Sequence, residues 1–234
     1  ALACGTAIGL ALVTKSSAIA LLFPALVVLV VSVPQSKAIL LALPLAFGPP
    51  IALWLRNSAL YGDPLAMSVF TKAFVGTAQA SDFIRELGAF AYWTGINDFG
   101  LGVGWWTARS FFGAFGYMDI FYPSWAIAAF WVVVLTGLIL SLRRPTSQEG
   151  KTVQLLCLIF GLVVFALFLR FNAQYFQAQA RYLFPALGIV SLGVGVGLSR
   201  LAGRWTALGI ALSLGLVNLL TLPWLSSEFA QRIR

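Results

Sequence analysis

The chain has 234 residues, of which 15 are Lys or Arg and 7 are Asp or Glu, so that only 9% are charged while 60% are hydrophobic. Soluble domains carry about 25% charged residues, so this composition excludes a soluble globular domain. It also excludes a disordered chain, which requires low hydrophobicity and high charge. A polytopic membrane protein remains.

Apolar runs along the chain predict transmembrane helices, because a spanning helix needs about 20 mostly apolar residues. The runs lack the period-two alternation of a transmembrane barrel. The sequence therefore predicts an all-α fold, a polytopic transmembrane helical bundle with about six full spans and one truncated span. The predicted helices cover 1–13 (truncated), 17–33, 38–56, 121–142, 152–170, 183–199 and 205–225.

The first run begins at Ala1, with no Met and no basic segment before it, which is not the pattern of a signal peptide. We therefore expect the chain to be a fragment of a longer membrane protein. Two spaced glycine pairs, Gly5-x-x-x-Gly9 and Gly193-x-x-x-Gly197, predict close approach of helices.

Three prolines fall inside the helix predicted over 38–56 and indicate a bend or a break. They are Pro44, Pro49 and Pro50.

Three short loops, 34–37, 143–151 and 200–204, fall on the same side of the membrane by helix parity. They are rich in basic residues, namely Lys37, Arg143, Arg144, Lys151, Arg200 and Arg204. The excess of Lys and Arg in cytoplasmic loops assigns this side to the cytoplasm. The long loop 57–120 is then extracytoplasmic. The predicted organisation is transmembrane helices over 1–56, this loop over 57–120, transmembrane helices over 121–225 and a tail over 226–234.

Loop 57–120 holds five of the seven acidic residues and many aromatic ones, which is typical of amphipathic segments that lie in the membrane interface. Ser81 is predicted to cap a short helix with Asp82 in its first turn. Gly95 and Gly100 fall in a stretch that we expect to be a flexible connection. No two acids have a spacing that demands a shared site, and Asp63 lies in an ordinary turn sequence.

Cations at the outward ends of predicted spanning helices call for an explanation. Inserting a charge at the middle of a membrane costs about 2.5–3.5 kcal/mol. Lys15 lies in a very short polar break between two apolar runs. One interpretation is a partner for an anionic lipid headgroup, and the other is a lysine that snorkels to mark a helix end. Arg109, in the amphipathic part of the long loop, is a further candidate.

Arg181 precedes the helix predicted over 183–199, and an arginine beside a helix N-terminus is a potential anion site. Gln177 and its neighbouring glutamines supply donors and acceptors suited to sugar hydroxyls. The alternative is that Arg181 and Tyr182 anchor the helix in the membrane interface.

The rest of the composition limits the chemistry. The absence of His excludes a His-ligated metal site and a histidine general base. Cys4 and Cys157 lie in apolar runs, which favours packing residues over a disulfide framework or a thiolate metal site. We predict no metal site and no cofactor, with metal dependence left open. The net charge of +8 does not cluster as a nucleic-acid-binding face requires, so nucleic acid is not an expected partner.

Four short phrases stand out in the chain, namely Gly9–Ala18 (GLALVTKSSA), Arg56–Pro64 (RNSALYGDP), Ser110–Asp119 (SFFGAFGYMD) and Ala180–Ala186 (ARYLFPA). In this order, within a hydrophobic multi-span chain, they resemble bacterial membrane glycosyltransferases of the GT-C superfamily. The nearest subgroup is the one related to protein mannosyltransferases and the aminoarabinose transferase of lipid A.

The resemblance implies an inverting glycosyltransferase of the bacterial inner membrane. Such enzymes transfer a sugar from a polyprenyl-phosphate donor to an acceptor on the extracytoplasmic face. The family's catalytic acid lies in a first outward loop, which we expect upstream of Ala1, so this portion is expected to be inactive alone. Lys15, Arg181 and Arg109 would bind the donor phosphate. Tyr182 and Gln177 would orient it.

Two other functions remain open on the sequence. A transporter or flippase component would move a lipid-linked sugar, although such proteins tend to have interrupted helices in matching halves. A non-catalytic membrane scaffold would use loop 57–120 as a docking surface.

Overall fold

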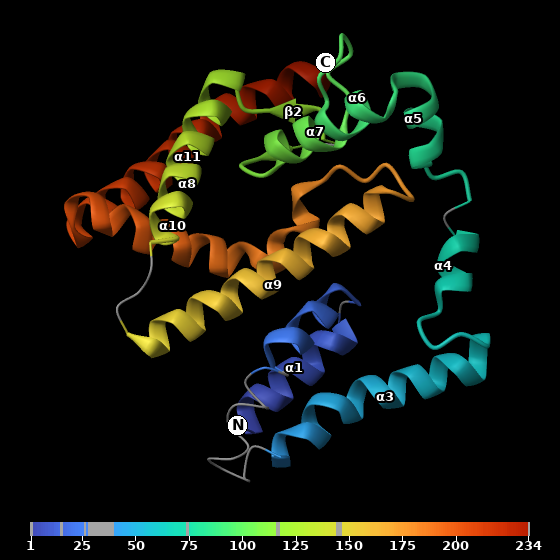
Figure 1. Cartoon of the computed structure of the whole chain (residues 1–234). Coiled ribbons are helices and arrows are strands. Elements are labelled where there is room, and N and C mark those ends of the chain that lie inside the picture. Colours follow the sequence, from blue (N-terminus) through green and yellow to red (C-terminus); the bar gives the residue numbers. More distant parts are fainter. Residues whose placement is uncertain are drawn as a thin grey trace. The chain divides into compact units, whose positions relative to one another are not determined.

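The computed structural model describes residues 2–14, 16–25, 27, 40–73, 75–115, 118–143 and 147–233 (Figure 1). Most of these residues lie in helices, in agreement with the all-α prediction, and in these ranges the only strands form one short hairpin. The chain divides into two compact units. Unit 1 comprises Ala1–Trp93 and Ser147–Ala178, and unit 2 comprises Thr94–Thr146 and Gln179–Arg234.

Four helices in the described ranges are long and apolar enough to cross a membrane. They are α8 (Ser124–Ser141), α9 (Gln148–Asn172), α10 (Leu187–Ala202) together with the turn before it, and α11 (Arg204–Ile233). They confirm the last four predicted helices. Residues 226–233, expected as a tail, continue α11. The helix over Ala42–Tyr61, which covers most of the predicted span 38–56, is not among these candidates, and Leu2–Thr14 is a shorter apolar helix. Much of 17–33 lies outside the described residues, so the total of about six spans stays a prediction.

Unit 1 holds the N-terminal helices, the helices of the long loop up to Trp93, and α9. Its further elements are α1 (Leu2–Thr14), the 3-10 helix η1 (Ser16–Leu21), α3 (Ala42–Tyr61), α4 (Met67–Ala73), α5 (Ala80–Leu87) and α6 (Ala89–Thr94), whose last residue begins unit 2. Loop 57–120 is therefore largely helical, in line with the amphipathic segments expected there.

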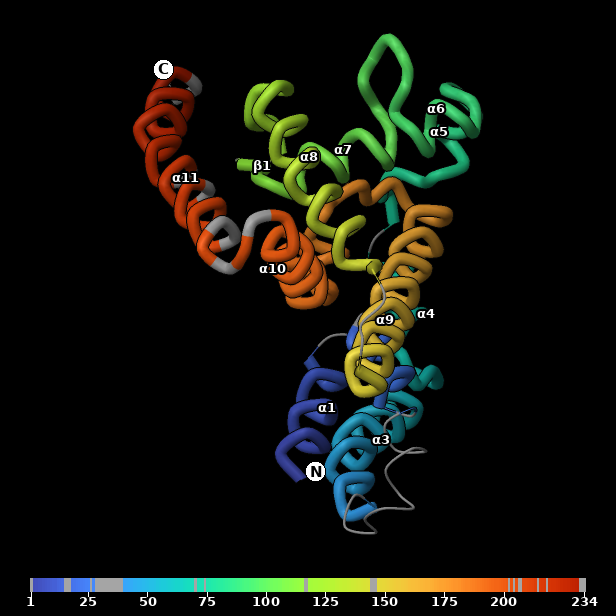
Figure 2. Tube along the Cα trace, turned by 60° about the vertical axis from the view of Figure 1, so that its left-hand side comes forward, coloured from blue at the N-terminus to red at the C-terminus, as the bar shows by residue number. Residues whose placement is uncertain are grey.

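The first glycine pair brings α1 against α3, and both views show these helices side by side (Figures 1 and 2). A Cβ atom on Gly5 would lie 2.5 Å from the backbone oxygen of Ala42, and one on Gly9 would overlap the backbone oxygen of Leu45. Only glycine fits at either position, so the predicted close approach is a contact within one chain.

The prolines predict a bend or a break in the helix 38–56. No break occurs, since α3 runs as one helix through Pro49 and Pro50. Pro44 lies in the first turn, where backbone N–H groups have no helical acceptor. Pro49 and Pro50 lack the N–H groups that would normally bond the carbonyls of Leu45 and Ala46. These two carbonyls are therefore left without their helical donors.

The freed carbonyls are the groups that α1 meets. A Cβ atom on Gly9 would overlap the oxygen of Leu45 and would lie 3.3 Å from that of Ala46. Because Gly9 has no side chain, the backbone of α1 can approach these two oxygens closely. The proline pair and Gly9 thus act as one packing motif, in which α1 covers the acceptors that α3 cannot satisfy itself.

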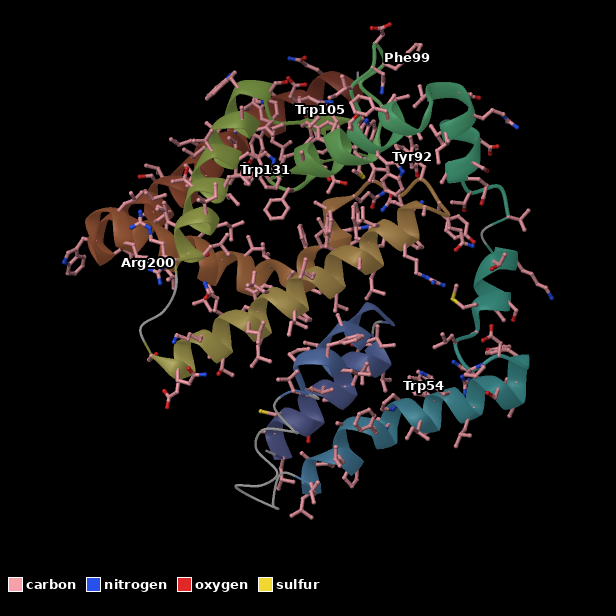
Figure 3. All side chains as sticks on the ribbon, viewed as in Figure 1. Trp54, Tyr92, Phe99, Trp105, Trp131 and Arg200 are labelled. Carbon is pink, nitrogen blue, oxygen red and sulfur yellow. The ribbon has the colours of Figure 1, made fainter. Side chains whose placement is uncertain are left out.

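The C-terminal end of α9 carries a buried polar cluster, here called the Asn172 hub (Asn172, Tyr92 and Gln177). The side chain of Asn172 donates to the carbonyl of Phe168 at 3.1 Å and accepts from the backbone N–H of Gln177 at 3.1 Å. Its own carbonyl accepts a hydrogen bond from the Tyr92 hydroxyl (Figure 3). Both Asn172 and Tyr92 are fully buried. The hub ends α9 and holds α6 against it.

The helix α5 begins two residues earlier than a Ser81 cap requires. Ala80 is its first residue and Gln79 its N-cap, so Ser81 lies inside the helix and the predicted cap is wrong. Asp82 does lie in the first turn, as predicted, and pairs with Arg85 at 3.3 Å. The helix ends at Gly88, whose φ of +80° is accessible mainly to glycine.

Unit 2 surrounds an aromatic core. Its further elements are α7 (Val103–Ser110), strands β1 (Ala114–Phe115) and β2 (Ile120–Phe121), and the 3-10 helices η3 (Ala180–Tyr182) and η4 (Phe184–Ala186). The strands pair antiparallel. Tyr122, Ala126 and Ile127 are buried among partly buried aromatic rings from the hairpin, α8 and α11. The indole N–H of Trp131 donates to the carbonyl of Ala108 at 3.0 Å and ties α8 to α7.

The second glycine pair brings α10 against α8. A Cβ atom on Gly197 would overlap the backbone oxygen of Gly137, and one on Gly193 would lie 3.0 Å from Leu138. Beside this crossing, the guanidinium of Arg200 donates to the carbonyls of Leu140 at 2.8 Å and of Arg143 at 3.1 Å (Figure 3). Arg200 therefore caps the C-terminal end of α8.

The stretch between α6 and α7, expected to be flexible, is organised by Asn97. Its side-chain oxygen accepts from the backbone N–H groups of Phe99 and Leu101, and its amide donates to the Leu101 carbonyl. The indole of Trp106 donates to the carbonyl of Gly100 at 3.0 Å. These bonds fix the loop backbone, so the glycines serve its turns.

Candidate functional site

The five predicted site residues fall in different parts of the chain. Lys15 lies outside the described residues. Gln177 belongs to unit 1, while Arg109, Arg181 and Tyr182 belong to unit 2. Only the last three can therefore be compared within one body.

Unit 2 contains a cavity of about 540 Å³, here called the Arg181 cavity. Its polar lining comes from Ser110, Gln179, Arg181, Tyr122 and Thr221. The rest of its wall is mainly aromatic and aliphatic, including side chains of the β-hairpin segment and of α11. Of the predicted site residues, Arg181 alone is part of this lining.

The edge of the cavity at Arg181 is fixed by a contact between α7 and η3. The Ser110 hydroxyl accepts the backbone N–H of Ala180 at 2.9 Å and donates to the carbonyl of Thr107 at 3.2 Å. Ala180 is fully buried. These bonds hold the turn that carries Arg181 against the end of α7. No local pattern predicts this role of Ser110, because it depends on a contact between segments 70 residues apart.

The backbone at Arg181 is not a helix N-terminus, contrary to the prediction. Two 3-10 turns, η3 and η4, come first, and α10 begins at Leu187. The N–H groups of Tyr182 and Leu183 donate to the carbonyls of Gln179 and Ala180, so they are already bonded. Proline at position 185 favours this delayed start, because the preceding residue is biased away from helical backbone. These two N–H groups are therefore not available to an anion.

The Arg181 side chain is exposed, and its guanidinium carbon lies 5.4 Å from the centre of the Tyr182 ring. Within the described ranges it has no ion pair and no side-chain hydrogen bond. A cation on an aromatic face keeps its hydrogen-bond donors for a ligand. Tyr182 therefore contacts Arg181 directly and limits where its charge can lie.

Arg109 does not line the cavity. Its guanidinium carbon lies 4.1 Å from the centre of the Phe121 ring and 5.7 Å from that of Trp105. Burial lowers the pKa of Arg109 from its ordinary value. Its Nε is buried without a hydrogen-bond partner among the described residues. Arg109 thus links α7 to strand β2 through aromatic contacts, and phosphate binding is not the role that this geometry supports.

The glutamine at the cavity is Gln179 and not Gln177. The backbone N–H of Gln177 is bonded in the Asn172 hub of unit 1. Gln179 lies directly before η3 and lines the Arg181 cavity. The sequence placed both residues in one glutamine-rich stretch, and only the path of the chain separates them.

The opposite wall of the cavity is held by Tyr122. Its hydroxyl lies 3.1 Å from that of Thr221 on α11, and its ring stacks on Trp224 at 6.1 Å between centroids. Leu222 and Leu225 of the same helix complete this wall. A candidate membrane-spanning helix therefore supplies the apolar side of the cavity.

No acidic residue of the described ranges lines the cavity. Asp63 accepts hydrogen bonds from the backbone N–H groups of Ser68 at 2.9 Å and of Leu65 at 3.0 Å, and these bonds lower its pKa. This is a turn that leads into α4, as its sequence indicates. In the same ranges, no three acidic or cysteine side chains gather as a metal site.

No family model, no curated protein and no solved structure matches this chain.

Proposed function

We propose that this chain is the donor-binding membrane portion of a glycosyltransferase that takes a sugar from a polyprenyl-phosphate carrier. The proposal includes the bacterial inner membrane as the location and the extracytoplasmic face as the side of the cavity. The observation that carries it is the lining of the Arg181 cavity.

That lining has two chemically different parts. One end carries an exposed arginine and an amide, Arg181 and Gln179, while aromatic and aliphatic side chains form most of the remaining wall. A polyprenyl-phosphate sugar has the same division, with an anionic phosphate between a polar sugar and a long apolar chain. Since arginine binds phosphate through two parallel hydrogen bonds, Arg181 is the residue that fits the phosphate.

The proposed chemistry requires a cation at the leaving group. An acceptor oxygen attacks the anomeric carbon, the bond from that carbon to the phosphate oxygen breaks, and the phosphate leaves with the electron pair. The acceptor proton passes to a base outside this chain. Arg181 stabilises the negative charge that develops on the phosphate, most effectively in a partly dry cavity. Gln179 takes the orienting role first expected of Gln177, and Lys15 remains a second predicted cation.

A flippase for the same lipid would bind the same headgroup, so binding alone does not distinguish the two functions. Transporters tend to have interrupted helices in matching halves, whereas the sequence predicts an interruption only in the helix 38–56. The helix α3, which covers most of that range, is continuous. Formation of a glycosylated product is therefore the measurement that separates them.

The test compares the full-length protein with its Arg181→Gln and Arg85→Gln variants in sugar transfer from a polyprenyl-phosphate donor. Arg85 is the matched control, because it is exposed and paired with Asp82. We expect Arg181→Gln to lower kcat/KM by about 10- to 100-fold, the loss of a charge-assisted hydrogen bond. Arg85→Gln should retain wild-type turnover. Equal turnover in both variants would remove the assignment of Arg181.

A further inference from the structure

A second groove lies in unit 1, at the end of α9, whereas the Arg181 cavity lies in unit 2. It has a volume of about 430 Å³ and is lined by Trp93, Leu169, Arg170 and Ala173. We name it the Arg170 groove. Its lining combines one cation, one indole and two apolar side chains.

The cation in this groove is not used by the fold. Arg170 is exposed in the last turn of α9, and within the described ranges it has no ion pair and no side-chain hydrogen bond. The helix end does not need it as a cap, because the carbonyls of Leu169 and Phe171 accept the backbone N–H groups of Ala173, Gln174 and Tyr175. Its donors are therefore available to a ligand.

The indole beside it is held in place. Trp93 makes an edge-to-face contact with Tyr92, with 5.2 Å between ring centroids. Tyr92 is fully buried and donates to the carbonyl of Asn172, two residues beyond Arg170. The Asn172 hub thus fixes both sides of the groove. Among the described residues the indole N–H of Trp93 has no acceptor, so it is a second available donor.

An exposed apolar stripe leads along α9 to this groove. Leu158, Leu162, Phe165 and Leu169 follow one another at spacings of three or four residues, and all are exposed, Leu162 at 67%. Residues at this spacing share one face of a helix. Since α9 is long and apolar enough to span a membrane, this face runs along the direction of lipid chains.

We propose that the Arg170 groove binds an anionic glycerophospholipid. The lipid phosphate accepts hydrogen bonds from the Arg170 guanidinium and from the Trp93 indole N–H, and one acyl chain lies along the stripe from Leu158 to Leu169. A negatively charged headgroup complements the unpaired guanidinium of Arg170. The indole of Trp93 suits the boundary between polar and apolar regions, where tryptophan is enriched in membrane proteins.

The test is native mass spectrometry of the detergent-purified chain titrated with dioleoyl phosphatidylglycerol or dioleoyl phosphatidylcholine. We expect the wild type to bind phosphatidylglycerol more tightly than phosphatidylcholine. Arg170→Gln should weaken phosphatidylglycerol binding about tenfold, because it removes a charged hydrogen bond. Trp93→Phe should weaken it less, because it removes a neutral hydrogen bond. Arg170→Lys should keep part of the preference, because lysine binds phosphate as a point charge. Arg85→Gln, an exposed and ion-paired arginine, should bind as the wild type does.

Two further measurements show whether the bound phosphate belongs to a lipid and whether it binds in the Arg170 groove. Inorganic phosphate should not displace the lipid, since it cannot occupy the apolar stripe. Arg181→Gln should leave phosphatidylglycerol binding unchanged, so the result is independent of the proposed transferase. Circular dichroism confirms that each variant is folded. The proposal is overturned if folded Arg170→Gln retains as much phosphatidylglycerol as the wild type, or if inorganic phosphate displaces it.

Discussion

At the scale of single residues, the fold assigns different tasks to side chains of the same type. Arg181 lines a cavity with its donors available, whereas Arg109 lies on the ring of Phe121 and Arg200 caps α8. All three are arginines near the ends of hydrophobic segments. What separates them is the local surroundings, namely aromatic rings for Arg109 and helix-end carbonyls for Arg200.

Tyr92 gives the clearest prediction at this scale. Burial raises its pKa to about 12, while an unfolded tyrosine titrates near about 10. Because the pKa of Tyr92 is higher in the folded state, the contribution of Tyr92 to stability is complete at any pH below its pKa in the unfolded chain. This contribution is then lost as the pH rises through the pKa of Tyr92 in the folded protein. We therefore expect the stability of unit 1 to fall between about pH 10 and about pH 12.

The check is thermal unfolding of Tyr92→Phe in detergent. Loss of the hydroxyl leaves the buried carbonyl of Asn172 without its donor, at a cost of about 1–3 kcal/mol at neutral pH. In this variant, the fall in stability between about pH 10 and about pH 12 should be largely absent. A decline as steep as that of the wild type would assign the titration to other groups.

At the scale of helices, two glycine contacts set the packing. Gly9 covers the carbonyls that the proline pair leaves free in α3, and Gly197 admits the backbone of α8. In lipid, helices gain little from burying apolar surface, so close backbone approach and van der Waals contact hold them together. Small residues at these two points therefore decide which helices touch.

The glycines of α10 allow a controlled test. Valine at position 197 would overlap the carbonyl of Gly137, whereas a Cβ atom on Gly195 meets nothing within 4 Å. We expect Gly197→Val to destabilise unit 2 by about 1–3 kcal/mol, the usual cost of overpacking. Gly195→Val, in the same helix, should be close to neutral. Unfolding midpoints in detergent measure both, and equal midpoints would contradict the contact.

At the scale of the whole molecule, the distribution of charge predicts the orientation in the membrane. The loops 143–151 and 200–204 carry basic residues, while 57–120 carries most of the acidic ones. Arg200 bonds the carbonyls of Leu140 and Arg143, which brings the ends of α8 and α10 together. This contact agrees with helix parity, which assigns both loops to one side.

Labelling of single cysteines tests that orientation. Both native cysteines are first removed by Cys4→Ser and Cys157→Ala. In this background, a cysteine introduced by Asp98→Cys should react with a membrane-impermeant maleimide in cells whose outer envelope is permeable and whose inner membrane is intact. Glu149→Cys should react only after the inner membrane is opened. The reverse pattern would invert the topology and place the Arg181 cavity on the cytoplasmic side or within the membrane.

The sequence alone determined the class of protein and the position of its main helices. Composition excludes a soluble domain, and long apolar runs form helices because lipid offers no partner for backbone groups. The four candidate spans from α8 to α11 and the two glycine contacts follow from such local patterns. The activity inferred from the four short phrases remains a proposal.

Only the tertiary structure decided which residues line a common cavity. Gln177 and Gln179 are two positions apart, yet one closes the Asn172 hub and the other lines the Arg181 cavity. The contact of Gly9 with Leu45 likewise joins two helices that are distant in sequence. Contacts between remote segments arise from packing, and a linear pattern of residue types does not specify them.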